Sequence, residues 1–190
     1  MSRNQALSAL SLTLVAATLA LTGTVAAHAQ TTVALPDTSQ ATTFDAEVSE
    51  QAHVTVPSTV TFNVNDVSSI TTAGAASVSA TNIVLADATK QLKISLQAAA
   101  AGFTPPVPGA ATWAASDISW AAATWTGSSA TGPVGGTLSN TAYNPVAFCD
   151  PDVAVCSTTA LVFKLAPNTS VTRAGSHTIV VNWKFESIGT

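Results

Sequence analysis

The sequence predicts an all-β protein, an antiparallel immunoglobulin-like β-sandwich of about seven to nine strands. Three observations favour this class. Short runs alternate apolar and polar side chains with period two, as in 90–97 and 176–185. Turn-forming Pro, Asn, Asp and Gly residues separate these runs at short intervals. Only 8% of the residues are charged, which suits a β-protein with a sparsely charged surface.

The first 29 residues predict where the protein works. Arg3 precedes an apolar run over 7–21, and Ala27-His28-Ala29 is an A-x-A cleavage signal. This layout is typical of a bacterial secretory signal peptide over 1–29. Its removal would leave 190 − 29 = 161 residues, enough for one domain. We therefore expect a secreted or cell-surface protein that does not insert into the membrane after cleavage.

Residues 30–46 are polar and Thr-rich, carry Pro36 and predict an extended N-terminal leader before a β-sandwich domain over 47–190. Within the leader, 31–35 could form one short strand. Two interpretations stay open. The leader is a disordered terminus, or it is a strand donated to a neighbouring subunit.

The first predicted strands follow the leader. Residues 53–56 alternate, Pro57-Ser58 makes a turn, and a strand over 60–64 places Val60, Phe62 and Val64 on one face. A further strand is expected over 77–85.

The run 90–97 is the clearest strand in the middle of the chain. Leu92, Ile94 and Leu96 are predicted to face the core, while Gln91, Lys93, Ser95 and Gln97 face outward. One solvated face favours an antiparallel sheet over a parallel one.

Residues 110–125 are ambiguous. Their alanines, and the spacing of seven between Trp113 and Trp120, would suit a helix. Ile118 and Trp120 instead alternate around Ser119, and Trp and Thr favour strands, so we predict a strand over 117–125. A glycine-rich loop over 127–136 and a short strand over 145–149 follow.

The last two predicted strands cover 160–166 and 176–185. Leu161, Phe163 and Leu165 share one face of the first. The inward face of the second is predicted to carry Ile179, Val181, Trp183 and Phe185, with Trp183 in the core.

The stretch from Ala174 to Trp183 (AGSHTIVVNW) resembles the closing strand of WxL-type cell-surface domains and related bacterial pilin-like β-sandwiches. In these proteins a glycine turn precedes an alternating strand that ends in Trp. Here Trp183-Lys184-Phe185 stands where that family has Trp-x-Leu. The resemblance implies a sandwich architecture and a surface location.

Charge limits the partners. After loss of the signal peptide, five basic residues stand against ten acidic ones, a net charge of 5 − 10 = −5. Nucleic acids and anionic membranes attract basic patches, so we expect neither as a partner. Partners are expected to be copies of the same chain or cell-surface polymers, and no cofactor is expected.

The only two cysteines, Cys149 and Cys156, predict a disulfide, because exported proteins oxidise such pairs. Asp150 and Asp152 lie in the intervening loop and are expected to shape its turn. Calcium binding by these carboxylates is the weaker alternative, and no metal site is predicted.

No motif indicates catalysis. The chain has no G-x-S-x-G elbow, and His53 and His177 are expected to be surface or edge residues. Trp113, Trp120 and Trp125 are expected to fill the sandwich core or cap its end, and an aromatic platform for sugars is the alternative. The sequence thus favours a non-enzymatic structural or fimbria-like subunit that self-assembles. A carbohydrate-binding module is the alternative, and a secreted hydrolase is third.

Overall fold

The computed structural model describes residues 32–38, 40–129 and 131–190. The predicted signal peptide, 1–29, lies outside these residues. The chain divides into two compact units, Met1–Asp45 and Ala46–Thr190. Every strand of the described chain belongs to the second unit.

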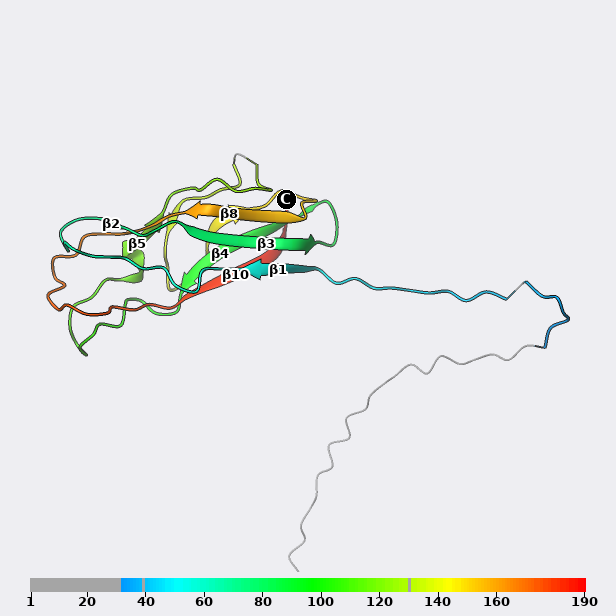
Figure 1. Cartoon of the computed structure of the whole chain (residues 1–190), viewed down its shortest axis with the longest axis horizontal. Coiled ribbons are helices and arrows are strands. Elements are labelled where there is room, and N and C mark those ends of the chain that lie inside the picture. The colour runs from blue at the N-terminus through cyan, green and yellow to red at the C-terminus, as the bar shows by residue number, and fades with distance from the viewer. Residues whose placement is uncertain (1–31, 39, 130) are drawn as a thin grey trace, which may run out of the picture. The chain divides into compact units, whose positions relative to one another are not determined.

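The second unit is built almost entirely of β-strands (Figure 1). All the strand pairs are antiparallel, which confirms the predicted fold class; the immunoglobulin-like topology stays a prediction. The described chain contains ten strands and one 3-10 helix: β1 Gln51–Thr55, β2 Thr71–Thr72, β3 Ala76–Val84, β4 Lys90–Ala98, η1 Ala115–Asp117, β5 Ile118–Trp120, β6 Gly136–Thr137, β7 Asn144–Phe148, β8 Val155–Leu161, β9 Phe163–Leu165 and β10 Val181–Gly189.

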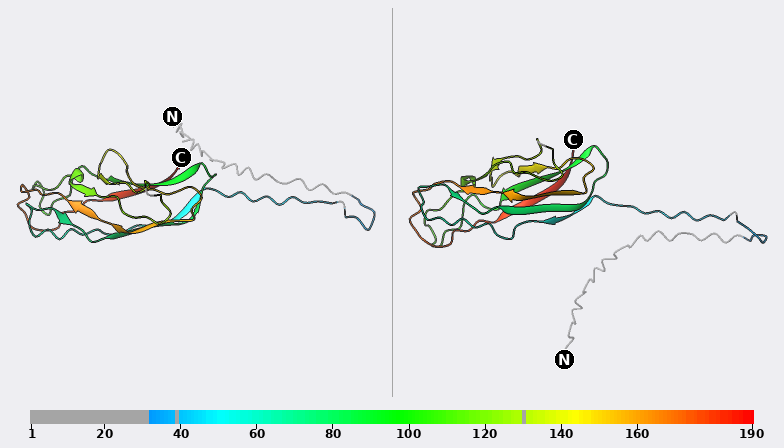
Figure 2. Two further views of the ribbon diagram at one scale, coloured as in Figure 1. Left: turned by 90° about the horizontal axis from the view of Figure 1, so that it is seen from above. Right: turned by 45° about the horizontal axis from the view of Figure 1, so that its top comes forward.

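The strands form three small sheets, ordered β1-β3-β8, β10-β4-β7 and β2-β9-β5-β6. In the first two sheets, β1 and β10 are terminal strands, so each has one edge without a neighbouring strand. The loop between β3 and β4 lies at the same end of the unit as the C-terminus (Figures 1 and 2). The loops around residues 66–70 and 168–175 lie at the opposite end.

The core forms where the inward faces of the sheets meet. Ile94 and Leu96 of β4 are 0% exposed, as their alternation predicts, and Leu161, Phe163 and Leu165 are buried too. Ser95 is the exception, because it was expected to face outward and is also fully buried. The pairing of β4 with β7 shifts register beside Ser95, with the extra residue on β7, whereas β4 keeps an unbroken register with β10. Ser95 therefore still points to the face opposite Ile94 and Leu96, and that face is covered here as well.

Three predicted strands differ in extent from those observed. The strand expected over 176–185 is β10, which begins and ends later, at Val181 and Gly189. The strand expected over 117–125 is confined to β5, and a 3-10 turn precedes it, in which Asp117 Oδ2 accepts the Ala114 N–H at 2.8 Å. The strand expected over 160–166 is split into β8 and β9. It divides because β8 pairs with β3, whereas β9 pairs with β2 and β5 in another sheet.

The strand predicted over 60–64 is the main correction. Val60, Phe62 and Val64 alternate in burial with their neighbours, as expected for a strand. Residues 56–65 nevertheless join no sheet and form no backbone–backbone hydrogen bond within the described chain. The side-chain pattern was therefore interpreted correctly, but the segment lacks a strand to pair with.

The described residues of the N-terminal segment before β1 form no helix or strand. Residues 32–35, part of the predicted short strand 31–35, join no sheet. Residues 40–49 are all exposed and form no strand. Phe44 is 93% exposed and Val48 is 68% exposed, which is unusual for large apolar side chains.

Within the described residues, no helix is long and apolar enough to cross a membrane.

Candidate functional site

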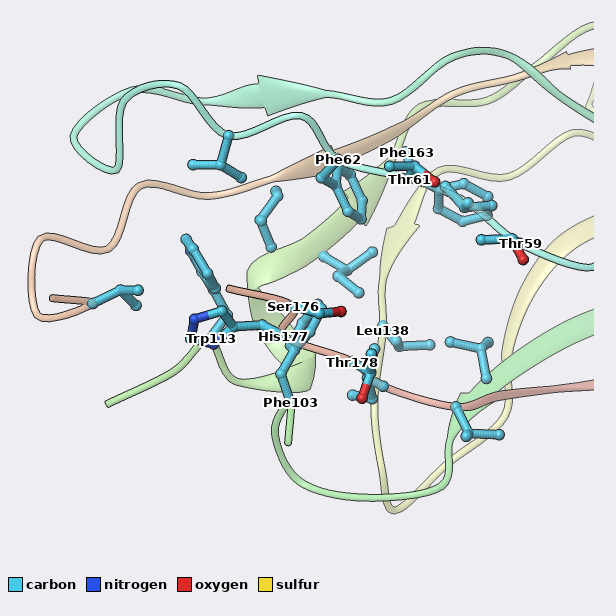
Figure 3. A pocket seen from close by; sticks show the side chains of 18 of the residues that line it. Thr59, Thr61, Phe62, Phe103, Trp113, Leu138, Phe163, Ser176, His177 and Thr178 are labelled. Atoms are coloured by element: carbon cyan, nitrogen blue, oxygen red, sulfur yellow. The ribbon is translucent and has the colours of Figure 1, made fainter. Parts of the chain in front are cut away.

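The second unit contains an apolar groove with a volume of about 960 Å³ (Figure 3). One wall is the segment 57–67, which joins no sheet, and the other is 171–183, which leads into β10. The floor consists of core side chains, including Leu96, Phe103 and Leu138. We call this hollow the groove.

The first wall, 57–67, offers free backbone groups. Its residues 57–65 are bonded to no other backbone group in the described chain, although Pro57 has no N–H to offer. A second hollow of about 540 Å³ lies between this segment and residues 74–77. The wall is thus separated from neighbouring backbone on that side as well.

The second wall runs into β10 at Val181, and from Thr178 onward one of its edges is occupied. Thr178 and Thr104 exchange both backbone hydrogen bonds, and the Ala99 N–H donates to the Val180 carbonyl. In an antiparallel pair, alternate residues point their N–H and C=O groups toward opposite edges. The backbone N–H and C=O groups of the odd-numbered residues therefore point away from β4, toward the edge where β10 has no neighbouring strand. These residues are 177, 179, 181 and 183.

The same residues also point their side chains inward. Ile179, Val181 and Trp183 face the core but are only half-buried, as are Val60 and Phe62 across the groove. The prediction that Trp183 is a core residue is thus corrected, since its inward face lines an open groove. Both walls lack the side chains that one more strand between them would supply.

One end of the groove holds His177. Its ring is half-buried and packs edge-on against Trp113, with ring centroids 5.2 Å apart. Nδ1 lies 2.8 Å from Thr112 Oγ1, and Nε2 lies 3.1 Å from the Arg173 carbonyl oxygen. His177 thus stays partly at the surface, as expected, while both ring nitrogens have protein partners that fix the ring at this end.

At the far end of β10, Glu50 joins the first and last strands. One of its carboxylate oxygens accepts the Ala86 N–H and the Ser187 hydroxyl, each at 2.8 Å. These bonds stabilise the charged form and lower the pKa of Glu50. The start of β1 is thereby fixed beside the end of β10.

The groove carries little charge. Arg173 is the only Lys, Arg, Asp or Glu among its lining residues. A charged small molecule would find few partners here, whereas an apolar strand would find both apolar surface and free amides.

The three tryptophans considered for a sugar platform are core residues. Trp113, Trp120 and Trp125 are 5%, 4% and 4% exposed. The indole N–H groups of Trp113 and Trp120 donate to the carbonyls of Ala166 and Val134, each at 3.0 Å. Only Trp113 reaches the groove, so the structure brings the three together in no exposed platform.

The two cysteines form the predicted disulfide, which links the residue after β7 to β8. Both are 0% exposed. In the loop between them, Asp150 Oδ1 accepts the Ser129 N–H at 2.9 Å, and Asp152 has φ 59°. These roles match the predicted turn.

Elsewhere, the exposed His53 has its Nδ1 3.3 Å from Asn82 Nδ2 on the neighbouring strand β3. Among the described residues, no group of three or more His, Cys, Asp or Glu side chains is arranged to hold a metal ion.

Comparisons with protein families, with curated proteins and with solved structures find no match to this chain.

Sequence reasoning missed the groove, although its signals were present. The alternation over 60–64 and 176–185 shows which side chains face inward, but not whether another strand covers them. A second signal lies upstream. Phe44, Ala46 and Val48 alternate with Asp45, Glu47 and Ser49, a period-two pattern that extends past the predicted leader.

Proposed function

We propose that this protein is a non-enzymatic, extracytoplasmic structural subunit that assembles with copies of itself by β-strand addition. One observation carries the proposal. An apolar groove lies between residues 57–65, which bond to no other backbone group in the described chain, and the edge of β10 that has no neighbouring strand there.

Strand addition would supply both a partner for the free backbone edge and a cover for the apolar surface of the groove. An added strand would pair its amides with the free edge at residues 177–183, and its alternate side chains would cover the half-buried wall. Each buried Val, Leu, Ile or Phe contributes roughly 1.5–3 kcal/mol, and each backbone hydrogen bond about 1 kcal/mol. These gains favour an added strand and act against the free-energy cost of association.

The location belongs to the same proposal. The predicted signal peptide and the disulfide support an oxidising compartment outside the cytoplasm. The low charge and apolar groove suit a subunit whose surface is covered by neighbouring subunits.

The carbohydrate-binding alternative has lost its main support, because Trp113, Trp120 and Trp125 are buried. Sugars stack on exposed aromatic faces, and the half-buried Trp183 is the only tryptophan left for that role.

The proposal is tested on the chain without residues 1–29. We expect light scattering and electron microscopy to reveal concentration-dependent polymers. Ile179→Asp places a charge inside the groove and should abolish them. Val180→Asp is the matched control, because Val180 is 66% exposed on the opposite face. A chain that stays monomeric at all concentrations, or equal assembly by both variants, would contradict the proposal.

A further inference from the structure

We infer that the strand entering the groove is residues 42–48 of a second copy of this chain, inserted antiparallel to residues 177–185. This inference rests on the proposed function and adds the identity, source and direction of the strand. It differs from the sequence prediction, which placed the short N-terminal strand at 31–35.

The first argument is the pattern of side chains. In an extended segment, Phe44, Ala46 and Val48 project to one side, and Asp45 and Glu47 project to the other. The apolar side matches a groove lined by Val60, Phe62, Ile179 and Val181, and the acidic side would stay in solvent. Residues 31–35 are followed directly by Pro36 and Asp37, which would interrupt such a strand.

The second argument is exposure. Residues 42–48 are all exposed in the described chain and belong to no sheet, despite carrying Phe44 and Val48. Exposed apolar side chains in period two are the complement that a groove with two free edges requires.

The third argument is length. Seven residues in strand conformation span roughly 20 Å, and the nine residues 177–185 span about 27 Å. The segment thus fits along the groove and the adjoining part of β10.

The chain cannot fill its own groove with this segment. Glu50 is fixed beside Ser187, so a hairpin would reverse there and residue 50 − n would face residue 50 + n. Phe62 is 12 residues after Glu50 and would then face Thr38, because 50 − 12 = 38. Phe44 would face Val56, outside the groove. The apolar residues reach the groove only when they come from another copy.

The direction follows from where each end lies. The two walls run in opposite directions, because Glu50 lies beside Ser187 and the Val67 carbonyl accepts the Asn168 N–H, so a strand antiparallel to 177–185 runs parallel to 57–65. In an antiparallel insertion, Val48 points toward His177, so the donor's own domain continues from the end opposite Ser187. A parallel insertion would bring that domain to the end where the acceptor's own segment leaves, beside Glu50. The antiparallel arrangement is a head-to-tail contact, which extends into an open polymer.

The test uses a fluorescent peptide with the sequence of residues 40–50 (QATTFDAEVSE). The receiver is the chain without residues 1–29, carrying Phe44→Asp and Val48→Asp to exclude its own segment. We expect saturable binding by fluorescence anisotropy. Phe44→Asp in the peptide should weaken binding by more than about a hundred-fold, because a charge would enter an apolar groove.

The controls separate the two proposals. Added Ile179→Asp in the receiver should abolish binding, while Val180→Asp should retain it. Circular dichroism checks that both receivers are folded, and peptide-induced hydrogen-exchange protection at 177–183 provides a second readout. Binding of a 31–41 peptide in place of the 40–50 peptide would overturn the assigned segment. Polymers that form without any 40–50 peptide binding would overturn this inference but leave the structural-subunit function standing.

Discussion

The Ser187 hydroxyl donates a hydrogen bond of 2.8 Å to Glu50 Oε1, joining residues that are 137 positions apart in the chain. This bond lies at the end of the unit where the N-terminal segment leaves. It fixes the start of β1 beside the end of β10, at the opposite end of this unit from the loop over 168–175.

Acid should destabilise the protein partly through Glu50. Its pKa is lowered in the folded state, first by the Ala86 N–H and then by the Ser187 hydroxyl. A lowered carboxyl pKa contributes stability above the ordinary value of about 4.5, and this contribution is lost as pH falls through the folded value. We expect urea unfolding of Glu50→Gln to show a shallower loss of stability between about pH 5 and pH 3. Ser187→Ala should have a smaller effect in the same direction, and an unchanged slope in Glu50→Gln would contradict this role.

Loss of the Cys149–Cys156 disulfide should lower the free energy of unfolding by roughly 2–3 kcal/mol, since a short loop is released in the unfolded state. Urea denaturation of the Cys149→Ala/Cys156→Ala double variant measures the change. Because both cysteines are fully buried, dithiothreitol should reduce the wild type slowly unless denaturant is present. Rapid reduction of the native protein would contradict this burial.

Tryptophan fluorescence distinguishes the groove from the core. In the monomer, acrylamide should quench Trp183 far more than Trp113, Trp120 and Trp125, because only Trp183 is half-buried. Trp183→Phe should therefore remove most of the quenchable signal, and assembly should protect Trp183 in the wild type. Strong quenching that persists in Trp183→Phe would instead place one of the other three tryptophans in solvent.

A substitution in the core should lower the stability of the monomer, whereas one in the groove should mainly weaken assembly. Leu161→Ala removes a side chain that is 0% exposed and should cost about 2–5 kcal/mol in urea unfolding. Val60→Ala, at a half-buried position in the groove, should cost roughly 1 kcal/mol or less in the monomer and still weaken assembly. A large loss of monomer stability in Val60→Ala would mean that the groove wall is ordinary core.

Much of the fold was accessible from the sequence because local alternation reports which side chains face inward. The strand over 90–97 and the inward set Leu161, Phe163 and Leu165 followed directly from this pattern. The pairing partners did not, because hydrogen bonds between strands depend on contacts between distant parts of the chain. For this reason 60–64 was predicted as a paired strand and 160–166 as a single one.

The site was harder to predict than the fold. The sequence favours core positions for Trp113, Trp120 and Trp125 over a sugar platform, and the burial of all three confirms this. Composition cannot distinguish a tryptophan that faces solvent from one that fills a core. The groove instead depends on a missing neighbour for β10, and an absent strand leaves no local mark in the sequence of its receiver. The signal for the proposed strand is instead the alternating pattern from Phe44 to Val48, at the boundary between the predicted leader and the predicted domain.

Disulfide trapping between two variants of the chain, each with one added cysteine, tests strand donation most directly. One copy carries Val48→Cys, and the other carries either Ile179→Cys or Phe185→Cys; the native disulfide is buried and remains closed. Antiparallel donation between copies predicts a covalent dimer, seen on non-reducing gels, for the 48–179 mixture and little for the 48–185 mixture, since Val48 would then lie roughly 20 Å from position 185. Linkage of 48 to 185 alone would contradict the direction, and linkage of neither would contradict donation of this segment.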